Sequence, residues 1–443
     1  MERNALERHF TAASLLRFAL PNIVMMVFLS LYTIVDGMFI SRYVGTLALS
    51  AVNMSYPLSS VQLAAGIMLG TGGSAVIARK LGEGKEEEAR QDFTWIVLAA
   101  AGVGVIFMLL GNGCLPRILK LLGTSTAQFP FCLPYTRILL WFAPAMFLQT
   151  AFQVLFVTAG RPGLGLAATA GGGLSNIVLD ALFMGPMGWG ITGAAVATGI
   201  GYCVPAVTGI VYFSLEKHCP LRFTRPVPRW RMLAGACGNG ASEMVSNIAV
   251  AVTTFLFNIL FLRYWGEDGV AAITIVLYFQ FVFSAVDLGF SMGVAPVVSY
   301  KYGAGDLPQL RQVHRVCMGF ILCTSAAMYG LSRLVISACL GLFTELEGPV
   351  AAITLEGFPL FAVSFLFMGV NIYASSLFTA FSNGVVSAVI SFARTFLFLV
   401  GALLLLPSLL GRTGIWLAVP VAELLGLAVS GAFLLWGKRR YRY

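Results

Sequence analysis

The chain has 443 residues, of which 58% are apolar or aromatic and 11% are charged, and its mean hydropathy is +0.86. Soluble domains carry roughly 25% charged residues, so this composition excludes a soluble globular enzyme. It also excludes a disordered chain, which combines low hydrophobicity with high net charge. The apolar residues form long blocks, and a block of about 20 residues crosses a bilayer as a helix. The composition therefore predicts a polytopic membrane protein.

Twelve apolar blocks follow one another along the chain. We expect membrane spans at about 13–41, 47–78, 93–115, 130–159, 163–184, 190–214, 232–262, 267–300, 315–340, 350–380, 384–406 and 413–436. The first of them follows a segment with both acids and bases and no small-residue cleavage site, which indicates a membrane helix and not a removed signal peptide. The expected fold class is all-α, with twelve transmembrane helices.

The basic residues indicate how the chain is oriented. With the N-terminus placed in the cytoplasm, 20 lysines and arginines fall on the cytoplasmic side and six on the opposite side. This bias follows the positive-inside rule. It predicts a multi-pass protein of the cell inner (cytoplasmic) membrane with both termini in the cytoplasm. The net charge of +9 thus reflects topology, and we expect no nucleic-acid partner.

An internal repeat organises the twelve spans. A shift of 221 residues lays 42–45 (RYVG) on 263–266 (RYWG), and 80–84 (KLGEG) on 301–305 (KYGAG). Each repeat holds six spans, so the two halves have the same orientation, as in transporters with parallel repeats. We predict an N-terminal six-helix lobe over 1–214, a cytoplasmic linker over 215–231 and a C-terminal six-helix lobe over 232–443. Two such lobes around a cleft suggest alternating access by rocking.

Several motifs resemble the multidrug and toxic compound extrusion (MATE) family of bacterial transporters. They are Pro21 with Asp36-Gly37, the glycine-rich run 66–84, Asn176–Asp180, Gly190–Thr198, Gly293–Gly303 and Gly414–Glu423. The resemblance covers the whole chain. It implies two six-helix lobes and export of amphipathic, often cationic compounds in exchange for Na⁺ or H⁺. At 156–160 (FVTAG) relatives often carry a basic or polar residue before the glycine, and this departure bears on substrate range.

The carboxylates inside the first lobe are the leading functional candidates, because a charged group at mid-span is costly to insert. Asn176 and Asp180 lie one turn apart in span five, Asp36 lies in span one, and Thr198 offers a hydroxyl from span six. Such oxygens suit a small hard cation, and two close carboxylates could instead share a proton. We predict a cation or proton coupling site at these four residues, with Asp36, Asn176 and Asp180 as Na⁺ ligands. The resemblance implies the same role. In the alternative reading, Asp36 pairs with Arg42 and Asp180 caps a helix end.

Pro21 is a candidate hinge in span one. A proline inside a helix removes a backbone hydrogen bond and kinks the helix. The resemblance implies that this kink changes with the protonation of Asp36, and a static kink is the alternative.

The second lobe and the walls of the expected cleft supply a further set of candidates. We predict a substrate-binding or second coupling site formed by Glu243, Asn247, Gln280, Asp287, Asn371, Tyr32, Gln149, Gln153 and Phe152. The resemblance likens Glu243 to a carboxylate implicated in coupling or in attracting cationic drugs. Arg394 could neutralise Glu243 or Asp287, and we expect Glu423 to brace the last span.

The chain lacks the sequence motifs of several classes of enzyme and metal site. The chain has no GxxxxGK[ST] or HExxH motif, and it has no CxxC pair. We therefore predict no enzyme and no cofactor other than a coupling ion, Na⁺ or H⁺. The predicted function is a secondary active antiporter, a monomer in the lipid bilayer, that exports small organic cations and amphiphiles. The alternatives are a flippase for lipid-linked saccharides of a related fold, whose cavity should be lined by arginines, and a channel.

Overall fold

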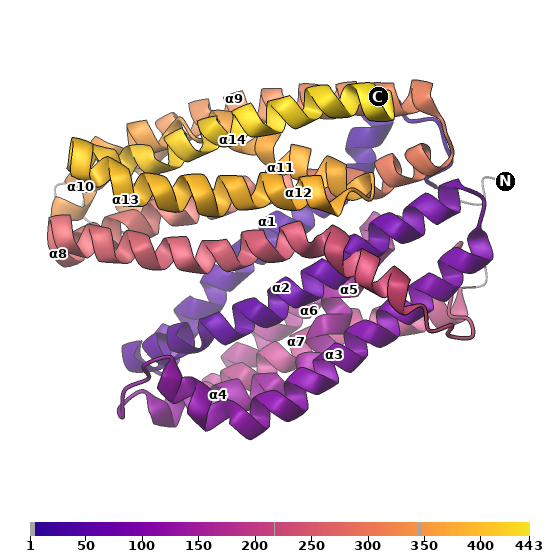
Figure 1. Cartoon of the computed structure of the whole chain (residues 1–443). Coiled ribbons are helices and arrows are strands. Elements are labelled where there is room, and N and C mark those ends of the chain that lie inside the picture. The colour runs from indigo at the N-terminus through magenta and orange to yellow at the C-terminus, as the bar shows by residue number, and fades with distance from the viewer. Residues whose placement is uncertain (1–4, 217, 344–347) are drawn as a thin grey trace.

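The computed structural model describes residues 5–216, 218–343 and 348–443, and within these ranges every regular element is a helix (Figure 1). The helices are α1 (Ala12–Tyr43), α2 (Thr46–Gly82), α3 (Glu86–Leu121), α4 (Phe129–Trp141), α5 (Ala143–Thr158), α6 (Pro162–Met184), α7 (Gly190–Leu215), α8 (Trp230–Gly303), α9 (Leu307–Phe343), α10 (Pro349–Ala362), α11 (Phe365–Ala380), α12 (Gly384–Phe392), the π-helix η1 (Ala393–Phe398), α13 (Leu399–Leu410) and α14 (Arg412–Tyr441). The all-α prediction is confirmed.

At three places the number of helices differs from the number of membrane spans. The pair α4 and α5 is bent by 58°, the pair α10 and α11 by 51°, and each pair is long and apolar enough to form one span. The 74-residue α8 is broken at Gly266, whose φ of 69° lies outside the helical region. With α8 counted as two spans on either side of Gly266, the described part of the chain holds the twelve predicted spans.

The backbone repeats with the offset found in the sequence. Gly84 and Gly305 have φ values of 75° and 70°, and Gly190 and Gly411 have φ values of 57° and 58°. These left-handed conformations favour glycine because it has no Cβ. The bend after α4 falls at Phe142, 221 residues before Val363, where α10 ends. The two halves of the chain therefore share one fold.

The bends between α4 and α5 and between α10 and α11 were not predicted. Pro144 explains the first, because a proline near the start of α5 cannot donate to the preceding turn. The second break lies at 363–364 without a proline beside it, and its position follows from the repeat.

The two halves meet at the end of the bundle that carries both chain termini, and they diverge toward the opposite end (Figure 1). A Cβ on Gly72 of α2 would overlap the carbonyl oxygen of Ala236, and a Cβ on Gly82 would overlap that of Tyr300. Since Ala236 and Tyr300 come from opposite ends of α8, the two arms of α8 fold back on each other. The Asn22 side chain of α1 also donates to Gly289 O over 2.6 Å. Backbone thus lies directly against backbone at this contact, which we call the terminal seal.

The segment before α1 joins the second half. Phe10 N donates to Gln309 Oε1 and Gln309 Nε2 donates to Phe10 O, each over 3.0 Å. Lys301 Nζ donates to Glu7 O over 3.0 Å. Leu6 and Phe10 are buried in a core cluster with residues of α8, α9 and α11. The residues 5–11, which we call the terminal strap, therefore pack on the second half although they precede the first.

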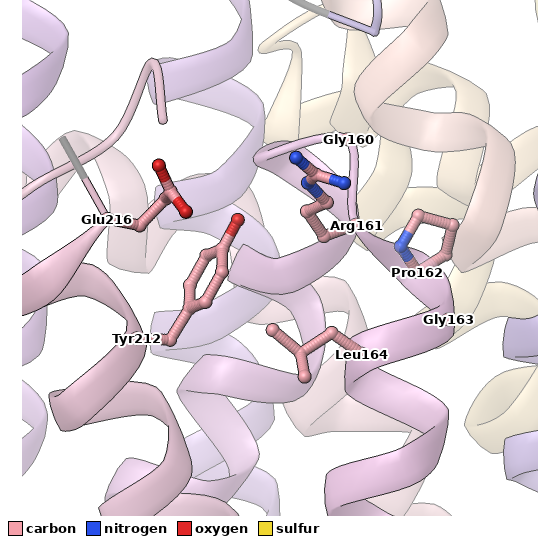
Figure 2. Close-up of a pocket in the computed structure, with 7 residues that line it drawn as sticks. All are labelled: Gly160, Arg161, Pro162, Gly163, Leu164, Tyr212 and Glu216. Carbon is pink, nitrogen blue, oxygen red and sulfur yellow. The ribbon is translucent and has the colours of Figure 1, made fainter. Parts of the chain in front are cut away.

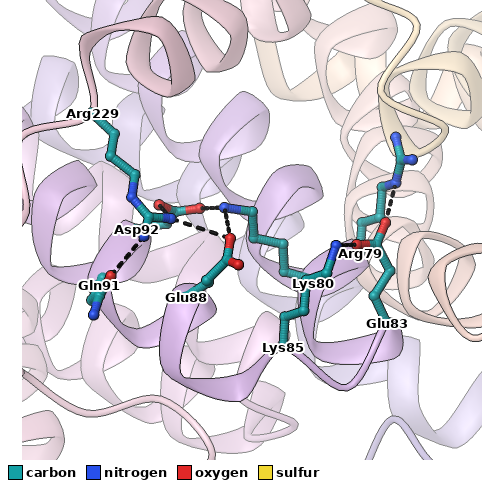
Figure 3. A network of polar contacts seen from close by, with 8 residues as sticks. All are labelled: Arg79, Lys80, Glu83, Lys85, Glu88, Gln91, Asp92 and Arg229. Carbon is teal, nitrogen blue, oxygen red and sulfur yellow. Dashed lines mark hydrogen bonds and ion pairs between the residues drawn. The ribbon is translucent and has the colours of Figure 1, made fainter.

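A polar network holds the segment between the halves (Figure 3). Arg229 contacts Glu88 (3.2 Å) and Asp92 (3.5 Å) of α3, and Lys80 of α2 also bonds to both acids. The predicted linker includes Lys217, which lies outside the described residues. The network ties the end of this segment to α2 and α3.

Candidate functional site

Close packing of α6 on α7 brings together the polar groups of the first lobe. A Cβ on Gly172 would lie 2.5 Å from Gly201 O, so only glycine permits this approach. A Cβ on Gly201 would in turn lie 3.2 Å from the Asn176 Cβ. The glycines therefore set the distance at which Asn176 of α6 reaches Thr198 of α7.

Asn176 connects Thr198 to Asp180. Asn176 and Asp180 are 0% exposed and Thr198 is 5% exposed. With the Asn176 amide nitrogen turned toward Asp180, it donates to Asp180 Oδ2 over 3.1 Å. The amide oxygen then accepts from Thr198 N over 3.0 Å and lies 3.2 Å from Thr198 Oγ1. This orientation satisfies both ends of the amide, which a buried polar group requires.

Asp36 of α1 completes the group, because its carboxyl group lies close enough to that of Asp180 for the two to interact. Asp36 Oδ1 and Asp180 Oδ1 are buried without a hydrogen-bond partner among the described residues. A buried carboxylate oxygen without a donor is costly. The structure thus brings the four predicted coupling residues together, and a proton or a cation would give the two carboxyl oxygens the partner that they lack.

The alternative readings of these two acids find no support. The ion pairs formed by the described residues do not include one between Asp36 and Arg42. The partners of Asp180 are the side chains of Asn176 and Asp36. Three tyrosines, Tyr32, Tyr135 and Tyr202, lie close enough to Asp36 to interact with it electrostatically. Tyr32 was predicted only as a substrate-binding residue, and the other two were not predicted. In a chain with 12% aromatic residues, no sequence signal distinguishes them.

A second polar group lies in the second lobe. Asn371 Nδ2 donates to Glu423 Oε2 (2.7 Å) and to Glu423 O (2.9 Å). Arg394 Nε lies 3.6 Å from Glu423 Oε1. The ion-pair partner of Arg394 is therefore Glu423, and not Glu243 or Asp287 as we expected. Arg394 sits in η1, and its charge acts electrostatically on both Glu243 and Asp287.

The other predicted site residues do not gather around one cavity. Asn247 donates to Glu243 O of its own helix over 2.8 Å. Phe152 is fully buried, with its ring 5.7 Å from that of Phe213, and so belongs to the core of the first lobe in this conformation. Gln153 is buried and contacts Thr169. Tyr32, Gln149 and Gln280 are half-buried, and Pro21 lies inside α1.

Two cavities lie away from these groups. One, of about 500 Å³, opens between the start of α6 and the end of α7, where Arg161, Tyr212 and Glu216 face a common space (Figure 2). The other, of about 830 Å³, lies along the arms of α8 and is lined by residues such as Phe255 and Tyr278. Neither is lined by the predicted coupling residues.

A metal ion would need neutral oxygens in addition to carboxylates. The described ranges contain no group of three His, Cys, Asp or Glu side chains placed to hold a metal. The Asp36–Asp180 pair with the Asn176 amide and the Thr198 hydroxyl offers the oxygen ligands that a hard monovalent cation takes. This donor set fits Na⁺ as well as a shared proton.

Comparisons with known proteins agree with this fold. The MatE family model matches residues 21–182 and 244–404, one segment in each half. The chain is 27% identical over 312 residues to the Probable multidrug resistance protein YoeA of Bacillus subtilis, covering 68% of this chain and 66% of that protein. It is 20% identical over 424 residues to the Multidrug export protein MepA of Staphylococcus saprophyticus, covering 94% of this chain and 92% of that protein.

A solved structure shows the same architecture. An outward-facing multidrug resistance MATE family transporter of the MOP superfamily superposes with a TM-score of 0.91 at 21% identity, covering 100% of this chain and 98% of that one. The family match spans more than half of the chain and both repeats. The chain therefore belongs to the MatE family, whose members are membrane transporters and not enzymes.

Proposed function

We propose that this protein is a secondary active exporter that exchanges amphipathic or cationic organic compounds for Na⁺ or H⁺. The observation that carries the proposal is the pairing of the half-buried Asp36 with the fully buried Asp180 beside Asn176. Multidrug names among the relatives support the substrate class. The coupling ion is the only cofactor in this proposal.

The pair supplies a means of coupling. Two buried carboxyl groups in contact are stable together only when a proton or a cation neutralises part of their charge. Binding of the ion at Asp36 and Asp180 changes how α1 packs on α6, and Pro21 gives α1 a flexible point. Each charge that crosses a potential of 100 mV supplies about 2.3 kcal/mol, which is enough to drive export against a concentration gradient.

The lobe arrangement supports one orientation of this cycle. We place both termini in the cytoplasm on the 20-to-6 distribution of basic residues, so the terminal seal closes the cytoplasmic end. The conformation is then outward-facing. We propose a monomer in the cell membrane with lobes 1–214 and 232–443.

The decisive experiment measures ethidium efflux from proteoliposomes with a Na⁺ gradient and a pH gradient imposed separately. We expect efflux under one gradient in the wild type and at least a tenfold loss in Asp36→Asn and Asp180→Asn. The matched control is Asp268→Asn, an exposed carboxylate outside the site. Unchanged efflux in Asp36→Asn would refute the coupling assignment. Continuous ion current without solute exchange would indicate a channel, and absence of efflux in the wild type would favour the saccharide-lipid flippase.

A further inference from the structure

The cavity between the start of α6 and the end of α7 carries two opposite charges that do not pair with each other. It is lined by the side chains of Arg161, Tyr212 and Glu216 (Figure 2). Tyr212 and Glu216 lie one turn apart at the end of α7, so they share a face of that helix, whereas Arg161 is the N-cap of α6. The ion pairs formed by the described residues do not include one between Arg161 and Glu216.

The Tyr212 hydroxyl points into the space between these two charges (Figure 2). Its oxygen is buried and has no hydrogen-bond partner among the described residues, although Arg161 and Cys219 lie close enough to interact with it. A buried hydroxyl without a partner is costly. A ligand that accepts a hydrogen bond from Tyr212 would therefore stabilise this end of α7.

The second half of the chain shows what covers the equivalent place there. Gly160 and Ser382 lie two residues after the ends of α5 and α11, and both have positive φ values, 74° and 58°. Beside the second of these turns, Asn383 Nδ2 donates to the Tyr441 hydroxyl over 2.8 Å. The Tyr441 ring stacks on that of Phe381, with the ring centroids 4.4 Å apart. Aromatic rings thus pack on this turn in the second half, whereas the turn in the first half borders the cavity.

The chain that follows α7 takes a different course. Arg90 of α3 donates to Pro220 O over 3.0 Å, and Leu221 is fully buried in the core of the first half. The segment after α7 is therefore held against α3. It leaves the space beside Arg161 open to a molecule from outside the chain.

The cavity lies at one end of two membrane helices, because α6 begins and α7 ends there. A Cβ on Gly160, which lines it, would lie 2.6 Å from the Cβ of Ala5 in the terminal strap, so the cavity is at the end that carries the terminal seal. From this end an apolar stripe runs along α7, formed by Val207 (55% exposed), Val211 (47%) and Leu215 (72%). In a bilayer such a stripe contacts acyl chains, and the cavity lies at the depth of the headgroups.

We propose that this cavity binds the headgroup of a zwitterionic phospholipid with a primary ammonium group, phosphatidylethanolamine, whose acyl chains lie along the α7 stripe. The phosphate accepts hydrogen bonds from the Arg161 guanidinium and the Tyr212 hydroxyl, and it lies near the positive end of the α6 dipole. The ammonium donates to the Glu216 carboxylate. One positive and one negative side chain match a headgroup that carries both charges, whereas Glu216 repels the net charge of an anionic lipid. This binding does not depend on the proposed exchange function.

Nondenaturing mass spectrometry of the full-length protein in detergent tests the proposal without transport. The probes are phosphatidylethanolamine, phosphatidylglycerol and free phosphoethanolamine, and each is titrated to obtain the Kd of the first bound molecule. We expect phosphatidylethanolamine to bind about tenfold more tightly than either of the others, because it alone has both the ammonium and the acyl chains. Glu216→Gln should remove its preference over phosphatidylglycerol. Arg161→Gln should weaken the binding of both lipids about tenfold.

Matched controls and one steric variant complete the test. Glu87→Gln and Arg117→Gln remove exposed charges that do not line the cavity, and they should leave the three Kd values unchanged. Gly163 lines the cavity, and a Cβ on it would meet no atom within 4 Å. Gly163→Phe should therefore fold with an unchanged Tm and weaken phosphatidylethanolamine binding about tenfold by filling the space.

Three outcomes would overturn the proposal. They are equal Kd values for phosphatidylethanolamine and phosphatidylglycerol in the wild type, a preference that survives Glu216→Gln, and free phosphoethanolamine that binds as tightly as the lipid. The last result would show that the ligand is a soluble compound with a phosphate and an ammonium group and not a membrane lipid.

Discussion

At the scale of single residues, Asn176 has the most demanding role that the structure describes. It is fully buried, and it links the backbone of α7 to the carboxyl of Asp180. Asp36, Asn176 and Asp180 come from segments up to 144 residues apart, and periodicity alone does not predict their contact. The resemblance to a family was needed to group them, whereas the pairing of Asn371 with Glu423 had no signal in the sequence.

Asn176→Ala should weaken coupling more than it weakens folding. The substitution removes the hydrogen bond to Asp180, and a hydrogen bond to a charged group is worth about 1.5–3 kcal/mol. We expect at least a tenfold rise in the concentration of coupling ion that gives half-maximal efflux, measured in proteoliposomes. Asn112→Ala is the control, because the hydrogen bond that Asn112 makes among the described residues goes to Met108 O of its own helix. Equal effects of the two substitutions would contradict the role of Asn176.

At the scale of helices, the network of Figure 3 decides how the segment between the lobes is held. Asp92 is 1% exposed and contacts both Lys80 of α2 and Arg229. At the end of α2, the pKa of Glu83 lies below its ordinary value, chiefly because Lys85 donates a hydrogen bond to it. The inner ion pairs are the ones that water screens least.

Asp92→Asn should loosen this segment. Removing one partner of a fully buried ion pair costs about 3–5 kcal/mol. We expect a smaller loss here, because Lys80 and Arg229 are partly exposed and both keep Glu88 as a partner. We expect a lower Tm and faster tryptic cleavage at Arg222, which is followed by Phe223. Glu87→Gln is the control, since Glu87 is 63% exposed and lies 3.7 Å from Arg90. Cleavage rates that match those of Glu87→Gln would show that the network does not hold the segment.

The sequence predicts the helices better than their interruptions. The twelve spans and the 221-residue offset follow from long apolar blocks and from glycines that recur at the turns, such as Gly84 and Gly305. The break at Phe142 has a local cause in Pro144, which could have been used. The π-helix η1, which contacts α14 in the fold, has no such signal in the sequence.

At the scale of the whole molecule, the terminal strap joins the two halves. Gln309 makes two hydrogen bonds to the backbone of Phe10, and a Cβ on Gly160 of the first half would lie 2.6 Å from the Ala5 Cβ. The strap thus touches both halves at the end where they meet. It stabilises the conformation in which the terminal seal is closed.

Gln309→Ala should shift the balance toward an opened seal. Two hydrogen bonds at about 1 kcal/mol each correspond to a change of about tenfold or more in the open population. Hydrogen exchange at residues 68–82 and 230–242 should accelerate by a similar factor. Gln128→Ala is the control, because Gln128 bonds to Ser50 at the other end of the bundle. Unchanged hydrogen exchange in Gln309→Ala would show that the terminal strap does not stabilise the closed terminal seal.

The terminal seal is largely main chain packed on main chain, because Gly72, Gly82, Gly240 and Gly303 each leave no room for a side chain. A backbone contact of this kind cannot open by a rotamer change of a single side chain. It opens only when whole helices separate, which is a slow, collective event. Between these events we expect no transient ion leak through the seal, so the membrane potential is preserved while no substrate is bound.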